Sequence, residues 1–481
     1  MHMQRCDAAP LAILRQEVTK LEFNLTAYDA NLERALVNAG KTSQLRRKLL
    51  RCLALPALSI LEYRRPQKPT LNIGVIGGSM VQGNMNCGGG GVYGCARRHQ
   101  VRNDLAYPRS LENMLRQALP GCKVQLRERA MGASGISTVL HSWSAMFNGQ
   151  EDLVIEDFSV NDVRGKVMVR GKCNDTKAVH KHLGSHEFMT RRIRERNASL
   201  LLMEAWPAYP TRCSPYTEYV HRTVADFYAL PLISFMRAIC NESSRESWSN
   251  APAAEHWPAG CGDLDTPGGS CEPHPGPHTH DIYAHLIALF ILRNAVEACA
   301  EVSAGAAVDA ANEMPPLGVS TIMPQNDLTA LHHLLSCAPP AKTVIEGCSF
   351  QQRYLYPKRK MVGFQCYEDR PGKPGWISEA GVRSSLSFLV KATKTGSIIL
   401  GFLRSYEGFG RAMVDIDGNH SISLDGHWDE RTSQVEYIAF KNEDVFNRSS
   451  LSRSFHHPST HHVRLHTTGE ARFKLVKLVT C

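Results

Sequence analysis

The pattern of apolar and polar positions changes twice along the 481 residues of the chain. Apolar residues recur at helical spacing between Leu11 and Leu21, and a basic and apolar stretch follows at residues 45–55. Neither stretch carries side chains with evident chemistry. We therefore interpret residues 1–70 as an N-terminal helical appendage.

From residue 71 the pattern alternates between strands and helices. Short apolar runs typical of buried strands lie at residues 71–77, 124–126, 152–158, 199–203 and 230–234. Helical stripes lie at residues 110–119 and 282–298. Strands that alternate with helices predict a three-layer α/β/α domain over residues 71–303, with a parallel sheet covered by helices on both faces.

The pattern changes again in the last third of the chain. Residues 304–342 are rich in Ala and Pro and are interpreted as a linker. Beyond them apolar residues alternate with polar ones, as at Ala412, Val414 and Ile416, and Gly-containing turns separate the runs. This period of two predicts an antiparallel β-sandwich over residues 343–481.

Four segments of the α/β pattern carry candidate chemistry. Ser79 follows the first strand, and Gly132 and Gly135 follow the second. Asn161 follows the third strand, and a His-rich segment from His274 to His280 precedes the last helix. The carboxyl ends of parallel strands are where open α/β folds place their sites. Taken singly, each segment also fits a turn or a helix cap, and the His-rich segment also fits a metal site.

In this order the four segments resemble the blocks of the SGNH (GDSL-like) hydrolase family, which are named for Ser, Gly, Asn and His. The resemblance covers about residues 71–300. It implies that Ser79 is the nucleophile, that His274 is the general base with His278 as runner-up, and that no cofactor takes part. It also implies an oxyanion hole formed by the Ser79 N–H, the Asn161 amide and the N–H of Gly132, with Gly135 as runner-up.

The chain departs from the family pattern at two places. The first block usually reads Gly-Asp-Ser, whereas this chain has Gly77-Gly78-Ser79. The family usually has an Asp three residues before the base, and Cys271 occupies that position here. The third member of the triad is therefore absent or replaced, as in the Ser–His dyads of some members. Possible substitutes are Glu272, Asp263 and Asp265.

The C-terminal sandwich resembles the modules that are joined to some SGNH domains, and carbohydrate-binding modules share that architecture. Trp376 and Trp428, with Tyr406 and Phe409, are candidates for stacking on sugar rings or for a place in the core. The resemblance implies a serine esterase that removes an ester, expected to be O-acetyl, from a polysaccharide or glycoconjugate. The alternatives are an acyltransferase or lipid esterase that uses the same residues, or an inactive carbohydrate-binding protein.

Composition and charge narrow the choice of partners. Apolar residues make up 43% of the chain and charged residues 21%, which excludes a mostly disordered chain. The mean hydropathy is −0.26, and no run of about 18 apolar residues predicts a membrane span. The net charge is +9, yet the basic residues form no long stripe interleaved with aromatics. We therefore expect no nucleic-acid partner.

The cysteines and the Asn-X-Ser/Thr sequons bear on the compartment. The chain has 15 Cys, an odd number that leaves at least one thiol unpaired within the chain, and the expected local disulfides are Cys87–Cys95 and Cys261–Cys271. No paired Cys-X-X-Cys spacing occurs, so we expect no structural metal. Sequons at Asn24, Asn174, Asn197, Asn241, Asn419 and Asn447 favour a secreted or lumenal protein, although residues 1–10 lack the apolar segment of a signal peptide.

Overall fold

The structure is a computed structural model whose chain divides into two compact units. The first comprises Met1–Ala130 and Ala145–Ile322, and the second comprises Met131–Ser144 and Met323–Cys481. The described residues are 8–28, 30–53, 68–78, 81, 106–130, 135–136, 140, 149–162, 176–205, 219–239, 277–304, 322, 343–346, 361–368, 374–392, 397–406, 408–418, 420–427, 433–441 and 459–480.

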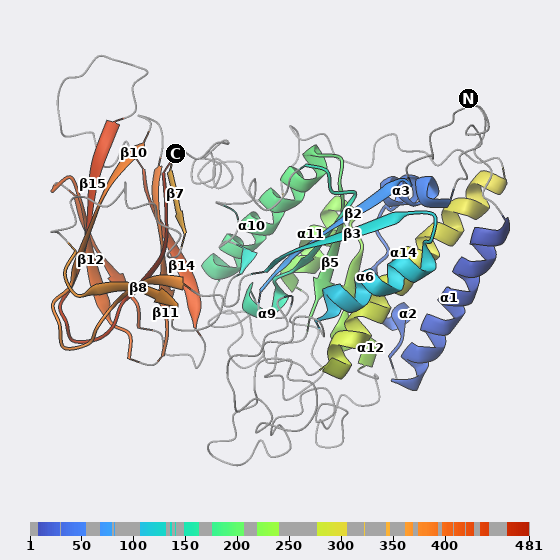
Figure 1. Cartoon of the computed structure of the whole chain (residues 1–481), viewed down its shortest axis with the longest axis horizontal. Helices are drawn as coiled ribbons and strands as arrows, with labels where there is room; N and C mark the ends of the chain where they lie inside the picture. The colour runs from blue at the N-terminus through green and yellow to red at the C-terminus, as the bar shows by residue number, and fades with distance from the viewer. Residues whose placement is uncertain are drawn as a thin grey trace, which may run out of the picture. The chain divides into compact units, whose positions relative to one another are not determined.

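The first unit is built on a six-stranded sheet with the order β1-β6-β5-β4-β2-β3 (Figure 1). The pairs β2–β3, β2–β4, β4–β5 and β5–β6 are parallel, and β1 is antiparallel to β6. The strands are β1 (Leu36–Asn38), β2 (Thr70–Gly77), β3 (Lys123–Ala130), β4 (Leu153–Asp157), β5 (Ser199–Glu204) and β6 (Leu232–Ser234). The parallel sheet that the sequence predicts is thus confirmed.

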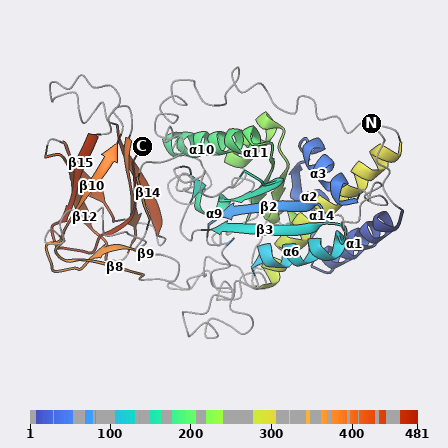
Figure 2. The same cartoon turned by 45° about the horizontal axis from the view of Figure 1, so that its top comes forward.

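Helices cover both faces of this sheet. Figure 2 shows α10 and α11 over one face and α1, α6 and α14 over the other. The helices of the unit are α1 (Ala8–Ala27), α2 (Leu32–Ala35), α3 (Ser43–Leu53), α6 (Tyr107–Ala118), α9 (Ser159–Asp162), α10 (Thr176–Glu195), α11 (Tyr219–Tyr228), α12 (Phe235–Ile239) and α14 (Pro277–Ser303).

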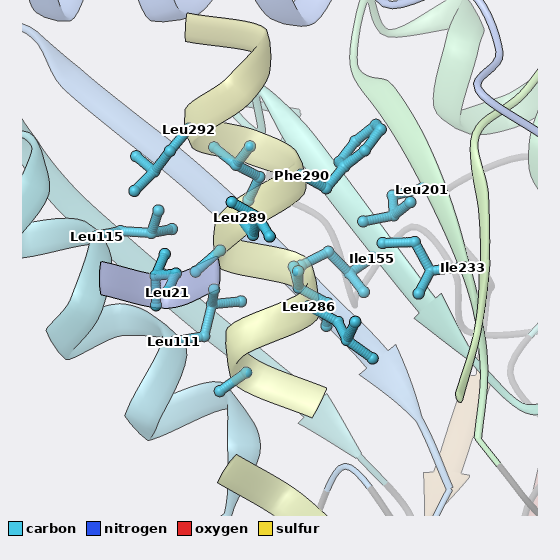
Figure 3. Packing of buried hydrophobic residues seen from close by; sticks show 14 of the residues in the cluster. Leu21, Leu111, Leu115, Ile155, Leu201, Ile233, Leu286, Leu289, Phe290 and Leu292 are labelled. Atoms are coloured by element: carbon cyan, nitrogen blue, oxygen red, sulfur yellow. The ribbon is translucent and has the colours of Figure 1, made fainter. Parts of the chain in front are cut away.

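The helix α14 is apolar along its length because it lies in the core. Leu286, Leu289 and Phe290 are at most 4% exposed. Figure 3 shows them near the side chains that α6 and the strands contribute, namely Leu111, Leu115, Ile155, Leu201 and Ile233. The segment Thr279–Ser303 is long and apolar enough to cross a membrane. However, 83% of its most apolar stretch of 18 residues is buried inside the protein. Its hydrophobicity is therefore explained by packing.

The N-terminal helices share this core. Leu14 of α1 and Leu49 of α3 are fully buried in the same hydrophobic cluster as α14. A disulfide joins Cys52, in α3, to Cys122, just before β3. It differs from the expected pairs Cys87–Cys95 and Cys261–Cys271, which lie outside the described residues. Residues 8–53 thus form part of the folded α/β unit.

The second unit contains two antiparallel sheets. One has the order β10-β15-β12-β13, and the other has the order β14-β11-β16-β9-β8 with β7 paired to β16. The strands are β7 (Thr343–Glu346), β8 (Phe364–Glu368), β9 (Pro374–Ser378), β10 (Ser385–Ala392), β11 (Ser397–Arg404), β12 (Arg411–Ile416), β13 (His420–Asp425), β14 (Gln434–Lys441), β15 (Ser459–Thr467) and β16 (Lys474–Thr480). Phe388 of β10 and Phe402 of β11 belong to one buried cluster. The two sheets therefore enclose a common core, and the predicted β-sandwich is confirmed.

We expect the Cys52–Cys122 disulfide to contribute to the stability of the first unit. It joins residues 70 positions apart, so it restricts the unfolded chain. Replacing both cysteines by Ala should lower the free energy of unfolding by about 2–4 kcal/mol. Urea unfolding of the full chain, followed by the helical circular-dichroism signal, measures this change because the named helices lie in the first unit. An unchanged midpoint in the double variant would contradict it.

Candidate active site at the carboxyl edge of the parallel sheet

The ends of the parallel strands lie along one edge of the sheet. Gly77 at the end of β2 is paired with Ala130 at the end of β3 and with Asp157 at the end of β4. These three strand ends therefore lie at the same edge of the sheet. In the sequence, Ser79, Gly132 and Asn161 follow them by two, two and four residues.

A close approach of two backbones shapes the turn after β2. The Gly78 N–H donates to the carbonyl oxygen of Asp157 at 3.3 Å. A Cβ atom on Gly77 would lie 2.5 Å from the same oxygen and 2.2 Å from Cγ2 of Val81. Glycine at position 77 is thus required for β2 to end against β4. Ser79, the next residue but one, lies outside the described residues.

The chain turns directly into α9 after β4. The Asp162 N–H donates to the Phe158 carbonyl at 3.0 Å, and the Ser159 hydroxyl donates to the Ala205 carbonyl, after β5, at 3.1 Å. The backbone of Asn161 lies in this short helix, but its side chain is outside the described part of the structure. Asn161 thus comes shortly after β4, as expected from the sequence, and its backbone lies within α9.

The structure describes only some of the remaining candidate residues. Gly132, His274 and Trp428 lie outside the described residues, as do the proposed substitutes for the missing Asp, namely Glu272, Asp263 and Asp265. Gly135 is described and is half-buried. For His278 only the backbone is described, in the first turn of α14.

The three described candidate aromatic residues of the sandwich differ in exposure. Trp376, in β9, is only 6% exposed and packs in the sandwich core. This burial leaves no open face on which a sugar ring could stack, so Trp376 serves as a core aromatic. Phe409 is 9% exposed, with the guanidinium of Arg472 over its ring at 5.4 Å. Tyr406 is 38% exposed.

His280 anchors the start of α14 in the interior. Its side chain is fully buried, its ring stacks on Tyr107 with centroids 6.1 Å apart, and its Nδ1 accepts the Tyr107 N–H at 3.4 Å. Burial lowers the pKa of His280 to about 3, so its imidazole is neutral at ordinary pH. His280 therefore joins the first turns of α6 and α14, directly after the His-rich segment.

Tyr107 also reaches the end of β4. Its hydroxyl donates to Oδ2 of Asp157 at 3.2 Å, and both side chains are buried. Burial is the main cause that raises the pKa of Asp157 to about 8. The Tyr107 hydroxyl lowers the cost of burying this carboxyl group, because it supplies a hydrogen-bond donor.

A larger polar cluster lies on the opposite face of the sheet. His186 of α10 has Nδ1 at 2.9 Å from Oε1 of Glu156 and Nε2 at 2.8 Å from Oδ2 of Asp162. His221 of α11 has Nε2 at 3.0 Å from His186 Nε2, and its Nδ1 is hydrogen-bonded to Glu204. All five of these side chains are at most 1% exposed. This group was not among the candidate sites identified from the sequence.

The charges of the cluster are strongly coupled. Burial opposes protonation of His186, but the carboxylates of Glu156 and Asp162 outweigh it and raise the pKa of that imidazole. Burial, with the charge on His186, lowers the pKa of His221. Burial alone would raise the pKa of Asp162, yet hydrogen bonds from His182 and His186 hold it well below its usual value. The cluster thus holds a proton on His186 between two carboxylates.

Two signals in the sequence could have revealed this cluster. Two adjacent acidic residues, Glu156 and Asp157, interrupt a strand that is otherwise buried on both faces, where an acid is found only when it has a partner. His182 and His186 are spaced four apart and so lie on one face of α10.

Comparison with known proteins bears on the fold. A scan of protein-family models finds no match, and a search of curated proteins finds no relative. Among solved structures, the chain is similar to a two-domain esterase (CEX) active on acetylated mannans and co-crystallized with mannopentaose. The TM-score is 0.53 at 17% identity, over 94% of this chain and 98% of that one. A second structure of a two-domain CEX esterase active on acetylated mannans gives a TM-score of 0.51 at 16% identity over the same shares.

These likenesses establish that the chain has the fold of a two-domain esterase. They extend over both units, since they cover nearly all of each chain. The expectation of a hydrolase-type α/β domain joined to a β-sandwich, which the resemblance to the SGNH family implied, is confirmed at the level of the fold.

The burial of His280 predicts how stability depends on pH. His280 titrates near pH 6.5 when unfolded but near pH 3 when folded, so below pH 6.5 the unfolded chain takes up a proton that the folded chain does not. Stability should fall by about 1.4 kcal/mol per pH unit from this residue as the pH drops through that window. His280→Asn, whose amide oxygen can accept the Tyr107 N–H, should flatten the dependence of the urea midpoint on pH between about 6.5 and 4.

The matched control is His427→Asn, because His427 is exposed in the second unit. This variant should keep the pH slope of the wild type. A His280→Asn variant with the wild-type slope would show that His280 is protonated in the folded state.

Proposed function

We propose that this protein is a serine esterase that removes acetyl groups from a polysaccharide. The observation that carries the proposal is the likeness, over 94% of the chain, to a two-domain esterase active on acetylated mannans. The order of Ser79, Gly132, Asn161 and His274 along the α/β pattern supports it independently. A mannan is the first substrate to test, because the related structure was co-crystallized with mannopentaose.

The strand pairing supports a common site for the nucleophile and the oxyanion donor. Gly77 and Asp157 are paired across β2 and β4, Ser79 follows two residues after Gly77, and Asn161 follows four residues after Asp157. Backbone N–H groups and a neutral amide near a Ser hydroxyl are suited to hold the negative charge that develops on an ester carbonyl. Asn161 would supply the amide, and Ser79 and Gly132 the N–H groups, with Gly135 as the alternative to Gly132.

The proposed reaction proceeds through an acyl-enzyme. The Ser79 hydroxyl attacks the acetyl carbonyl while His274 takes its proton, and the sugar hydroxyl leaves with the proton that His274 returns. Water activated by the same imidazole then releases acetate and restores Ser79.

The proposed base comes just before α14 in the sequence. His274 lies three residues before Pro277, where α14 begins, and the first turn of that helix is fixed by the buried His280. His278, within that turn, is the alternative base. The site would act as a Ser–His dyad, or with Glu272, Asp263 or Asp265 in place of the usual Asp.

We also propose that the protein works in an oxidising compartment, secreted or in the lumen of the secretory pathway. The Cys52–Cys122 disulfide supports this, and Cys299 and Cys366 are disulfide-bonded as well. Disulfides persist in such compartments, where sequons such as the exposed Asn197 can also be glycosylated.

Ser79→Ala should abolish catalysis. Loss of a serine nucleophile typically lowers kcat by about 10³–10⁶-fold, because the covalent pathway is removed. Release of acetate from acetylated mannan by the full chain measures the effect. A fluorophosphonate probe should label the wild type but not Ser79→Ala.

The matched control is Ser423→Ala, since Ser423 is exposed on β13 in the second unit. This variant should keep both activity and labelling. A wild type that the probe does not label would favour a carbohydrate-binding protein without activity. A strong preference for p-nitrophenyl esters of long acyl chains would replace the polysaccharide assignment with a lipid esterase.

Asn161→Ala should slow the reaction without removing the nucleophile. Removal of one oxyanion donor typically costs about 10²–10³ in kcat, or about 3–4 kcal/mol. The probe should still label this variant, only more slowly. Steady-state kinetics with an acetyl ester test the prediction, and an unchanged kcat would exclude Asn161 from the oxyanion hole.

A further inference from the structure

Three side chains from three elements place metal-binding atoms together under the sheet edge. Glu156 of β4, His186 of α10 and His221 of α11 each offer one ligand atom, and these atoms all lie within 4.8 Å of one another. The three side chains are at most 1% exposed. They belong to the polar cluster described above, and the proposed esterase reaction uses none of them.

Glu156 lacks the hydrogen bonds that a buried carboxylate requires. Its side chain is fully buried, and neither Oε1 nor Oε2 has a hydrogen-bond partner among the described residues. His186 Nδ1 lies 2.9 Å from Oε1 but is likewise without a bond of acceptable geometry. In the described part of the chain, the two imidazoles are the only ion-pairing neighbours of Glu156. A buried carboxyl group in this state is stabilised by a neighbouring positive charge, which either a protonated His186 or a metal ion can supply.

The tautomer of His221 directs a lone pair toward the same space. Its Nδ1 is bonded to the buried carboxylate of Glu204, so Nδ1 carries the proton and Nε2 is left as the acceptor. His221 Nε2 faces His186 Nε2 at 3.0 Å and Glu156 Oε1 at 3.8 Å. A carboxylate bonded to the far nitrogen is the arrangement that orients histidine ligands in metal sites.

The separations suit a small divalent ion. Two donors that each lie about 2.0–2.1 Å from a tetrahedral zinc ion are about 3.3 Å apart. Glu156 Oε1 lies 2.9 Å from His186 Nδ1 and 3.8 Å from His221 Nε2, on either side of this value. The ligand atoms of the three side chains all lie within 4.8 Å of one another. Two imidazoles and one carboxylate favour zinc and similar transition metals over Mg²⁺ or Ca²⁺, which prefer oxygen ligands.

We propose that Glu156, His186 and His221 bind one divalent transition-metal ion, with Zn²⁺ as the first candidate. The ion takes a lone pair from each of the three side chains and displaces the proton that otherwise lies on His186, which leaves to solvent. Because the side chains are buried, the ion is structural: it ties β4 to α10 and α11.

This inference revises the expectation of a chain without a metal. That expectation rested on the absence of paired Cys-X-X-Cys spacings, whereas these ligands lie 30 and 35 residues apart in sequence. The proposal does not depend on the esterase reaction, and an inactive protein would be expected to bind the ion equally well.

The experiment measures the metal in the full chain. The protein is produced in zinc-supplemented medium, purified without a metal-chelating resin and analysed by mass spectrometry for about one Zn²⁺ per chain. After removal of the metal with a chelator, addition of Zn²⁺ should raise the Tm. Co²⁺ should give the ligand-field spectrum of a nitrogen and oxygen site, without the charge-transfer band that a cysteine thiolate would produce.

Variants of the ligand residues test which side chains bind the ion. Glu156→Gln and His221→Gln should each lower the affinity for Zn²⁺ by at least 10–100-fold, a loss that even an outer partner of a ligand can cause. His285→Gln should keep the ion, because His285 is a similarly buried imidazole (7% exposed) outside the cluster. If the ligand variants do not fold, the Zn²⁺ titration and the Co²⁺ spectrum of the wild type decide the question.

Two results would overturn the proposal. One is a folded, metal-free wild type that binds neither Zn²⁺ nor Co²⁺. The other is Zn²⁺ retained at full affinity by both Glu156→Gln and His221→Gln. In either case the cluster is held by a proton shared between His186 and its two carboxylates, and the chain has no metal at this place.

Discussion

The parallel pairing of β3, β2, β4 and β5 is the constraint on which the arrangement of the first unit depends. Parallel strands run in the same direction, so their carboxyl ends lie along one edge. Gly77, Ala130 and Asp157 meet there in register. Residues far apart in sequence are thereby brought to one edge of the sheet by the pairing of the backbones.

The alternation of side chains along each strand then gives the two faces of the sheet different chemistry. In β4, Leu153 and Ile155 face the apolar cluster around α14, and Asp157 meets Tyr107 of α6 on that side. Glu156 points to the opposite face, where α10 and α11 supply His186 and His221. The two successive carboxyl groups of β4 thus have different buried neighbours. Asp157 has a hydroxyl donor, and Glu156 has two imidazoles.

The polar cluster is connected to the proposed catalytic edge through α9. Asp162, bonded to His186, follows directly after Asn161 in that helix, and Ser159 is bonded to the backbone after β5. The conformation of the turn that carries Asn161 is thus set by buried contacts below it. The side chains of the cluster are buried, so the cluster bears on the proposed catalytic edge through the position of α9.

Local sequence patterns by themselves determined several elements of the fold and the order of the candidate catalytic residues, but they did not predict α10 and α11. Apolar runs and helical stripes predicted β2, β4, β5 and α14, because burial imposes a period that a short window already contains. The alternation at Ala412, Val414 and Ile416 likewise predicted a strand of the sandwich. Ser79 and Asn161 were identified by their positions after strands, which is a local property too.

Only the tertiary structure decided which distant residues meet. The Cys52–Cys122 bond joins α3 to the start of β3, although closer cysteine pairs exist in the sequence. Glu156, His186 and His221 come together only because β4 lies under α10 and α11, and Trp376 is a core residue because two sheets close over it. Such contacts depend on how whole elements pack, and no local periodicity encodes that packing.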